Sequence, residues 1–105
     1  MADFMKLLAQ AQEMQGKFQT LQADLQKESV TASAGGGMVT VEANGQGTVR
    51  SIKIDPSVVN ATDVEMLEDL VLVAVNEAQK KAAELAKSEM SRLAGGLNLP
   101  FKLPF

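Results

Sequence analysis

Apolar side chains in the first segment of the chain recur at alternating spacings of three and four residues, with charged and amide side chains between them. This is the a/d pattern of a heptad repeat, and it is narrower than the apolar stripe of an ordinary globular helix. The pattern predicts a helix over about residues 3–26 that packs against another helix along one seam. The seam consists of Phe4, Leu7, Ala11, Met14, Phe18, Leu21 and Leu25.

The region from about residue 28 to residue 55 changes to the alternation of apolar and polar positions that is typical of β-strands. β-branched residues become common there, charged residues become rare and glycines cluster. Three short strands are marginal by themselves, so the antiparallel sheet that they form needs a helix or a second sheet to cover it. The strands are expected at residues 30–34, 38–43 and 48–54.

The turn between the second and third strands begins at Asn44-Gly45, a dipeptide that strongly favours a hairpin. We expect the loop to extend to Gly47, with Gly45 and Gly47 both at positive φ. In the returning strand, Ile52 and Ile54 occupy even-numbered positions, whereas Val49 occupies an odd-numbered one, so the three side chains would not share one face of a regular strand. This mismatch predicts a bulge or a twist near residues 50–51.

A second, longer helix is expected over about residues 62–93. Thr62 to Glu65 fits a capping box with Thr62 as the N-cap, and Gly95-Gly96 is expected to close the helix. The first half is broadly apolar and should cover the sheet, whereas the second half narrows to an apolar stripe among charges. Because such a helix is about 50 Å long, its second half should project and pair antiparallel with the first helix.

The last segment, residues 97–105, contains Leu-Pro-Phe twice and should be extended, because proline blocks helix. Two interpretations remain open for it. Its leucines and phenylalanines could dock on the body of the protein or on a partner subunit. Alternatively, they could form a short peptide motif that another protein binds.

These elements predict an α+β fold in one domain over residues 1–105, with the order helix, three-stranded antiparallel sheet, long helix (αβββα). The chain has no cysteine and no histidine, which removes the thiolate ligands of zinc and the commonest general base. The acids Glu65, Glu68 and Asp69 fall in the first turns of the last helix, where the macrodipole favours them. We therefore expect no catalytic residue, no metal, no cofactor and no small-molecule substrate.

The N-terminal residues do not have the pattern of a signal peptide, and no apolar run approaches the ~20 residues that span a bilayer. We expect a cytoplasmic protein with no membrane partner.

Several further blocks follow one another in a fixed order along the chain. They are Gly37–Gly45, Ile52–Pro56 and Glu65–Val71, with Asn76 and Ala78 after them. Together with the Gln-rich first helix and the Leu-Pro-Phe ending, these blocks resemble the YbaB/EbfC family of bacterial nucleoid-associated proteins over nearly the whole chain.

The resemblance implies a homodimer whose two sheets join, with paired helices that project from each end as arms. It also implies binding to duplex DNA at the nucleoid, with effects on nucleoid organisation and gene expression. The DNA contacts of the family are assigned to the first and last helices and not to a compact signature.

The charge distribution permits such binding, although the net charge of −3 opposes it. Residues 29–75 carry two bases against six acids, whereas residues 76–105 carry five bases against three acids. If the two helices are antiparallel, Lys6 should lie near Arg92. The candidate DNA-binding residues are Lys6, Lys80, Lys81, Lys87 and Arg92.

The alternative for each of these bases is a solvated helix face with pairs four residues apart, such as Glu77 with Lys81 and Lys80 with Glu84. No arginine-rich arm and no pair of stacking aromatic residues is visible for reading bases. If binding occurs, we expect it to be weak, dominated by phosphate contacts, strongly salt-dependent and low in sequence preference.

A different function remains open beside DNA binding. A β-hairpin between two helices with coiled-coil patterning is similar to the layout of prefoldin subunits, which hold clients at the tips of their helices. The alternative is therefore a coiled-coil protein-interaction or chaperone-like module that does not bind DNA.

Overall fold

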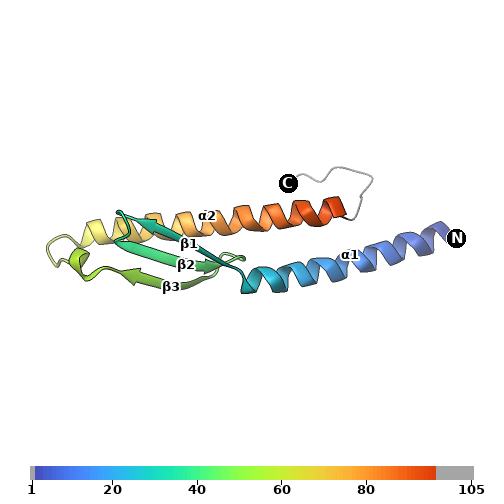
Figure 1. Ribbon diagram of the computed structural model, residues 1–105, viewed down its shortest axis with the longest axis horizontal. Coiled ribbons are helices and arrows are strands. Elements are labelled where there is room, and N and C mark those ends of the chain that lie inside the picture. The colour runs from blue at the N-terminus through green and yellow to red at the C-terminus, as the bar shows by residue number, and fades with distance from the viewer. Residues whose placement is uncertain (1, 97–105) are drawn as a thin grey trace.

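The computed structural model describes residues 2–96 and contains a helix, a three-stranded antiparallel sheet and a second long helix (Figure 1). The predicted αβββα order is therefore confirmed. Residues 97–105, with the two Leu-Pro-Phe sequences, lie outside the described residues. The elements are α1 (Ala2–Lys27), β1 (Ser29–Ala34), β2 (Val39–Asn44), β3 (Val49–Ile54), the 3-10 turn η1 (Pro56–Val58) and α2 (Val64–Gly96).

The sheet has the order β1-β2-β3, and its two faces differ in polarity. Val41 of β2 pairs with Ala32 of β1 and Ile52 of β3, so these three side chains share the apolar face. The first half of α2 covers this face over β1 and β2, and Ala74 and Ala78 are fully buried against it. The opposite face carries polar side chains from all three strands: Thr31, Ser33, Thr40, Glu42, Ser51 and Lys53.

The predicted bulge in β3 is confirmed, because Glu42 pairs with Ser51 and Ala43 pairs with Val49, which leaves Arg50 as the extra residue. Gly47 has the predicted positive φ, 86°. The same prediction for Gly45 is wrong. Gly45 is needed for a close approach instead, since a Cβ atom there would lie 2.7 Å from the carbonyl oxygen of Leu25.

The hairpin between β2 and β3 makes hydrogen bonds to the C-terminal end of α1. The N–H of Gly45 donates to the carbonyl oxygen of Leu25 at 2.8 Å, and Nε2 of Gln46 donates to the carbonyl oxygen of Gln22 at 3.1 Å. The guanidinium of Arg50 donates to the carbonyl oxygen of Gln26. Leu25 and Gln26 belong to the last turn of α1, where backbone carbonyl groups lack the N–H partners of a continuing helix, and the three bonds together fix the direction of α1 relative to the sheet.

Both ends of α2 differ from the prediction. Asp63, not Thr62, is the N-cap, because Oδ1 of Asp63 accepts from the N–H of Met66 at 3.2 Å. The hydroxyl of Thr62 instead donates to Oδ1 of Asn60 at 2.8 Å. At the other end, α2 continues through both glycines to Gly96, since Gly95 does not adopt the positive φ of a closing residue.

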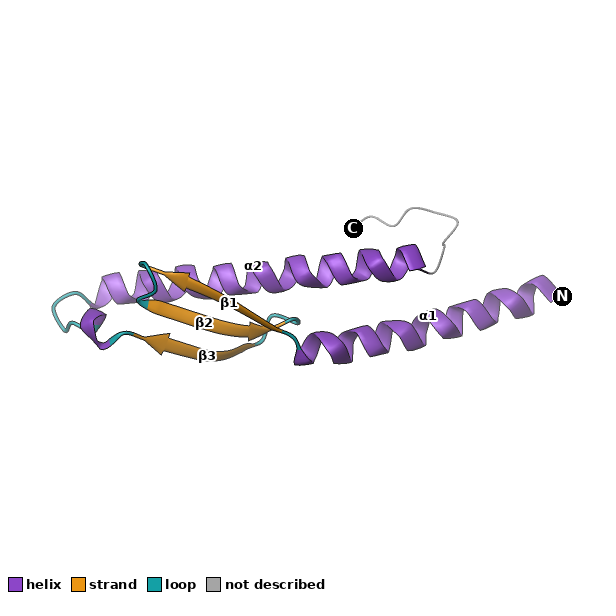
Figure 2. Ribbon diagram, viewed as in Figure 1, coloured by secondary structure: helices purple, strands orange, loops and turns teal. Residues whose placement is uncertain are grey.

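The molecule is elongated, with principal extents of 72 × 22 × 16 Å. Its radius of gyration is 19.7 Å, whereas a compact chain of this length has about 13 Å. The elongation arises because α1 and the second half of α2 extend from the sheet toward the same end (Figure 2). We call the sheet with residues 64–78 the body, and α1 with residues 79–96 the arms.

The close approach at Gly45 predicts a large effect of one methyl group. Gly45→Ala should lower the free energy of unfolding by about 1–3 kcal/mol, because the added Cβ meets backbone that cannot move aside freely. Gly16→Ala is the matched control. Gly16 lies within α1 with no atom near its Cβ direction, so this change should raise stability by about 0.5–1 kcal/mol. Urea unfolding midpoints measure both, and equal midpoints for the two variants would contradict the account.

Candidate nucleic-acid interface

The two arms run antiparallel and lie side by side near the body (Figure 1). This agrees with the predicted pairing, but the seam of α1 is covered over only part of its length. Leu21 and Leu25 are buried, whereas Phe18 is 40 % exposed and Phe4 is 64 % exposed. Because α2 does not extend that far, the N-terminal part of the seam has no helix beside it within the described residues.

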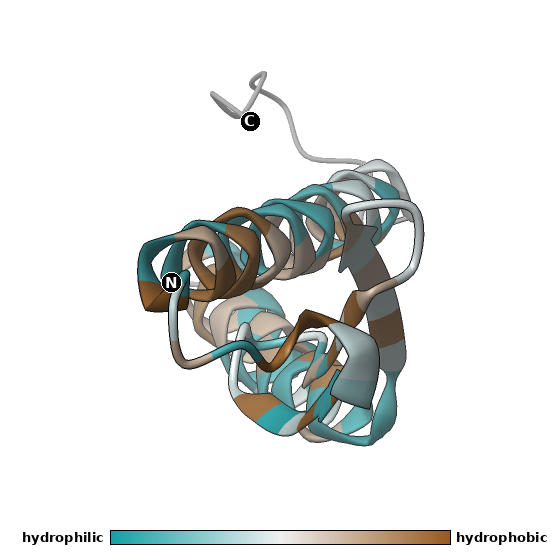
Figure 3. Ribbon diagram, turned by 90° about the vertical axis from the view of Figure 1, so that its left-hand side faces the viewer, coloured by the Kyte–Doolittle hydropathy of each residue, from teal (hydrophilic) through white to brown (hydrophobic). Residues whose placement is uncertain are grey.

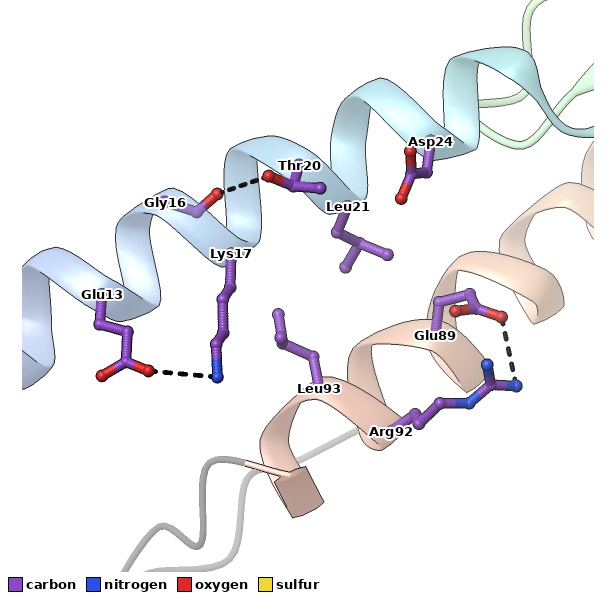
Figure 4. A pocket seen from close by; sticks show the side chains of 9 residues that line it. All are labelled: Glu13, Gly16, Lys17, Thr20, Leu21, Asp24, Glu89, Arg92 and Leu93. Atoms are coloured by element: carbon purple, nitrogen blue, oxygen red, sulfur yellow. Dashed lines mark hydrogen bonds and ion pairs between the residues drawn. The ribbon is translucent and has the colours of Figure 1, made fainter.

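A groove of about 670 Å³, which we call the arm groove, separates the arms where α2 ends (Figure 4). Leu21 of α1 and Leu93 of α2 point toward one another across it. Charged side chains of both signs line its walls, and two ion pairs form there: Lys17 to Glu13 at 3.3 Å and Arg92 to Glu89 at 3.4 Å. Asp24 adds a further carboxylate. With three acids and two bases, the groove is a poor site for phosphate.

Lys80 and Lys87 lie on a different side of α2 from this groove. They are exposed and seven residues apart, so they share one face of the helix. Glu89 lines the groove. Lys87 precedes Glu89 by two residues, which is a rotation of about 200° around the helix axis, so Lys87 lies on the side of α2 away from the groove. The ion pairs among residues 2–96 do not include Lys80 or Lys87.

The other two bases of α2 have partners within the chain. The ammonium group of Lys81 donates to the backbone carbonyl of Thr31, on the edge strand β1, at 2.8 Å. Arg92 pairs with Glu89, as described above. The pairs expected on a solvated face, Glu77 with Lys81 and Lys80 with Glu84, do not form among residues 2–96.

Lys6 is exposed on α1, but the prediction that it lies near Arg92 is wrong. Arg92 lines the arm groove opposite Leu21 and Asp24. Lys6 precedes Leu21 by fifteen residues of helix, which places it about 20 Å farther along the arm. The antiparallel direction was predicted correctly, whereas the register between the helices was not.

Lys17 is a basic residue of the arms that the sequence reasoning did not select. It lies in the arm groove, and its ammonium group is held by Glu13. The spacing of four residues between an acid and a following lysine was the available signal.

Asp55, just before the turn η1, has a structural role. The backbone N–H of Ser57 donates to Oδ1 of Asp55 at 2.9 Å, and this bond lowers the pKa of the Asp55 carboxyl. Asp55 thereby caps the turn η1 before α2. Within residues 2–96, no cluster of acids could hold a metal ion, and no helix is long and apolar enough to cross a membrane.

Comparison with known proteins places this arrangement in a family. Residues 1–97 match the model of the YbaB/EbfC DNA-binding family. The chain belongs to that family. It is a family of nucleoid-associated DNA-binding proteins and not of enzymes.

Curated relatives and a solved structure agree with the assignment. A nucleoid-associated protein of Gemmatimonas aurantiaca is 50% identical over 103 residues, which cover 98% of this chain and 99% of the relative. A nucleoid-associated protein of Thermodesulfovibrio yellowstonii is 56% identical over 97 residues, with coverage of 92% and 85%. The crystal structure of an uncharacterized Helicobacter pylori protein matches with a TM-score of 0.79 and 28% identity, covering 88% of this chain and 97% of that one.

Proposed function

We propose that this protein is a homodimer that binds duplex DNA at the nucleoid, mainly through phosphates and with little sequence preference. In this way it affects nucleoid organisation and gene expression. Membership of a DNA-binding family and relatives named nucleoid-associated proteins support DNA as the partner. The main observation in support of the interface is that Lys80 and Lys87 are both exposed and lie on the same face of α2.

The charge distribution along the molecule supports contact through the arms. Residues 29–75, which form most of the body, carry two bases against six acids and repel phosphate. Lys80 and Lys87 are about 10 Å apart along α2, and a dimer presents the pair twice. Lys6 is a third candidate near the free end of the other arm. Lys81 and Arg92 contribute less to binding, because each would exchange an existing contact for a phosphate.

The weak sequence preference follows from the same side chains. Specific base reading depends on bidentate arginine or amide contacts to base edges. The guanidinium of Arg92, the base of the arms best suited to such a contact, is already paired with Glu89. Lysine acts as a point charge and suits phosphate without selecting a base.

The body has an apolar surface that supports dimerisation. Ile52 and Ile54 of the edge strand β3 belong to the apolar face of the sheet, yet they are about 40 % exposed, because α2 covers mainly β1 and β2. Viewed from the body end, apolar residues lie on both α2 and the strands (Figure 3). Exposed apolar patches of this kind mark interaction sites, and joining two β3 strands would extend one sheet through both subunits. Large apolar side chains are also exposed on the first half of α2 and in the loops next to the sheet: Val64, Met66, Leu72 and Val73 on α2, and Met38 and Val59 in the loops.

The DNA interface is tested by the salt dependence of binding. Wild-type affinity for a labelled random-sequence duplex should fall linearly on a log–log plot against KCl concentration. The double variant Lys80→Gln/Lys87→Gln should bind more weakly, and its slope should be smaller by about 2 to 4, since each phosphate contact contributes about 0.9 and a dimer has two copies. Fluorescence anisotropy measures both quantities.

The matched control is Lys27→Gln/Lys53→Gln, which removes the same charge from the end of α1 and from the polar face of the sheet. Its slope should stay close to that of the wild type. Equal losses in the two double variants would show that only net charge matters and would contradict the assigned interface.

The dimer surface is tested by one charge on β3. Ile54→Lys should shift the protein from dimer to monomer in sedimentation velocity experiments, because the substitution places an unpaired charge in an apolar interface. Ser51→Lys adds the same charge to the opposite, polar face of the same strand and should leave the dimer intact. A monomeric wild type, or an Ile54→Lys variant that remains dimeric, would refute the proposed surface.

A further inference from the structure

The part of the α1 seam that α2 leaves uncovered is an apolar surface without a partner in the described structure. We call it the open seam; it comprises Phe4, Leu7, Ala11, Met14 and Phe18. Phe4 and Leu7 are each more than 60 % exposed. Isolated exposed apolar residues are ordinary, but five at a/d spacing form a continuous line along one side of a helix. The surface therefore has the form of a docking site for an elongated apolar partner.

The chain itself continues at the place where this surface begins. The helix α2 ends at Gly96, three residues after Leu93, whose side chain points across the arm groove toward Leu21 (Figure 4). Nine residues follow, and an extended segment of that length reaches about 30 Å. The open seam spans fifteen residues of helix, from Phe4 to Phe18, or about 21 Å along the axis. The C-terminal segment is therefore long enough to follow the open seam from end to end.

The sequence of this segment matches such a surface in pattern. Its large apolar residues occupy every odd-numbered position from Leu97 to Phe105, whereas Asn98, Lys102 and two prolines occupy the even ones. In an extended chain, this alternation places all five apolar side chains on one face. The prolines block a helix and reduce the conformational entropy lost on docking.

We propose that residues 97–105 dock along the open seam of the same chain and complete the packing of the arm that α2 leaves unfinished. The segment continues the line of α2 as an extended strap on α1. This contact is independent of DNA binding and concerns the side of α1 that carries the apolar seam. It assigns the Leu-Pro-Phe sequences to a binding surface on their own chain.

Disulfide trapping tests the contact directly, because the natural chain has no cysteine. Leu99→Cys is combined with Ala11→Cys on the open seam or, as the matched control, with Ala9→Cys on the opposite side of α1. Under mild oxidation, the intrachain disulfide should form at least about tenfold faster with Ala11→Cys, since docking raises the effective concentration of one thiol near the other. Equal rates for the two pairs would overturn the proposal. Selective formation of interchain disulfides with Ala11→Cys would assign the strap to a second copy and would also overturn it.

Hydrogen exchange tests the same contact without cysteine. In the full-length protein, Phe101→Ser/Leu103→Ser should speed amide exchange over residues 4–18 by about fivefold or more, because loss of packing lets that part of the helix open more often. The control Asn98→Ser/Lys102→Ser changes only the polar positions and should leave the rates as in the wild type. Unchanged exchange in the Phe101→Ser/Leu103→Ser variant, with the strands equally protected in both, would refute docking on the arm.

Discussion

The contact between the β2–β3 hairpin and the C-terminal end of α1 determines the shape of the molecule. The N–H of Gly45 reaches the carbonyl oxygen of Leu25, while the Leu25 side chain is buried. No residue with a Cβ atom fits there without displacing this backbone. Because α2 is fixed to the same sheet by its buried alanines, both arms leave one rigid body in the same direction.

This geometry gives the arms surfaces of different chemistry. The groove between the arms contains leucines and charges of both signs that pair with each other. On a different side of α2, Lys80 and Lys87 have no ion-pair partner among residues 2–96. Since the excess of acids lies in the body, we propose this basic face as the surface that meets a phosphate backbone. Affinity without base reading is the expected result of lysine contacts made by a rigid helix.

The fold could be predicted because its elements depend on local periodicity. The heptad spacing of α1, the alternation in the strands and the parity break at the bulge each indicated the correct structure. Two of the errors concern contacts between residues distant in sequence. Glycine is required at position 45 because the backbone of α1 lies against it. The position of Lys6 relative to Arg92 depends on the register between the two helices, which the hairpin contact sets. The N-cap was misplaced by one residue because Thr62 and Asp63 are both good caps, and Asn60 binds the first of them.

Which lysines touch DNA is the central question, and chemical footprinting of the wild-type protein answers it most directly. Lysine acetylation would be quantified by mass spectrometry with and without a random-sequence duplex at low salt. We predict that Lys80 and Lys87 become protected on adding DNA, while Lys53 on the sheet is acetylated at an unchanged rate. Protection of Lys53 with no protection of Lys80 and Lys87 would contradict the account and would move the DNA from the arms to the body.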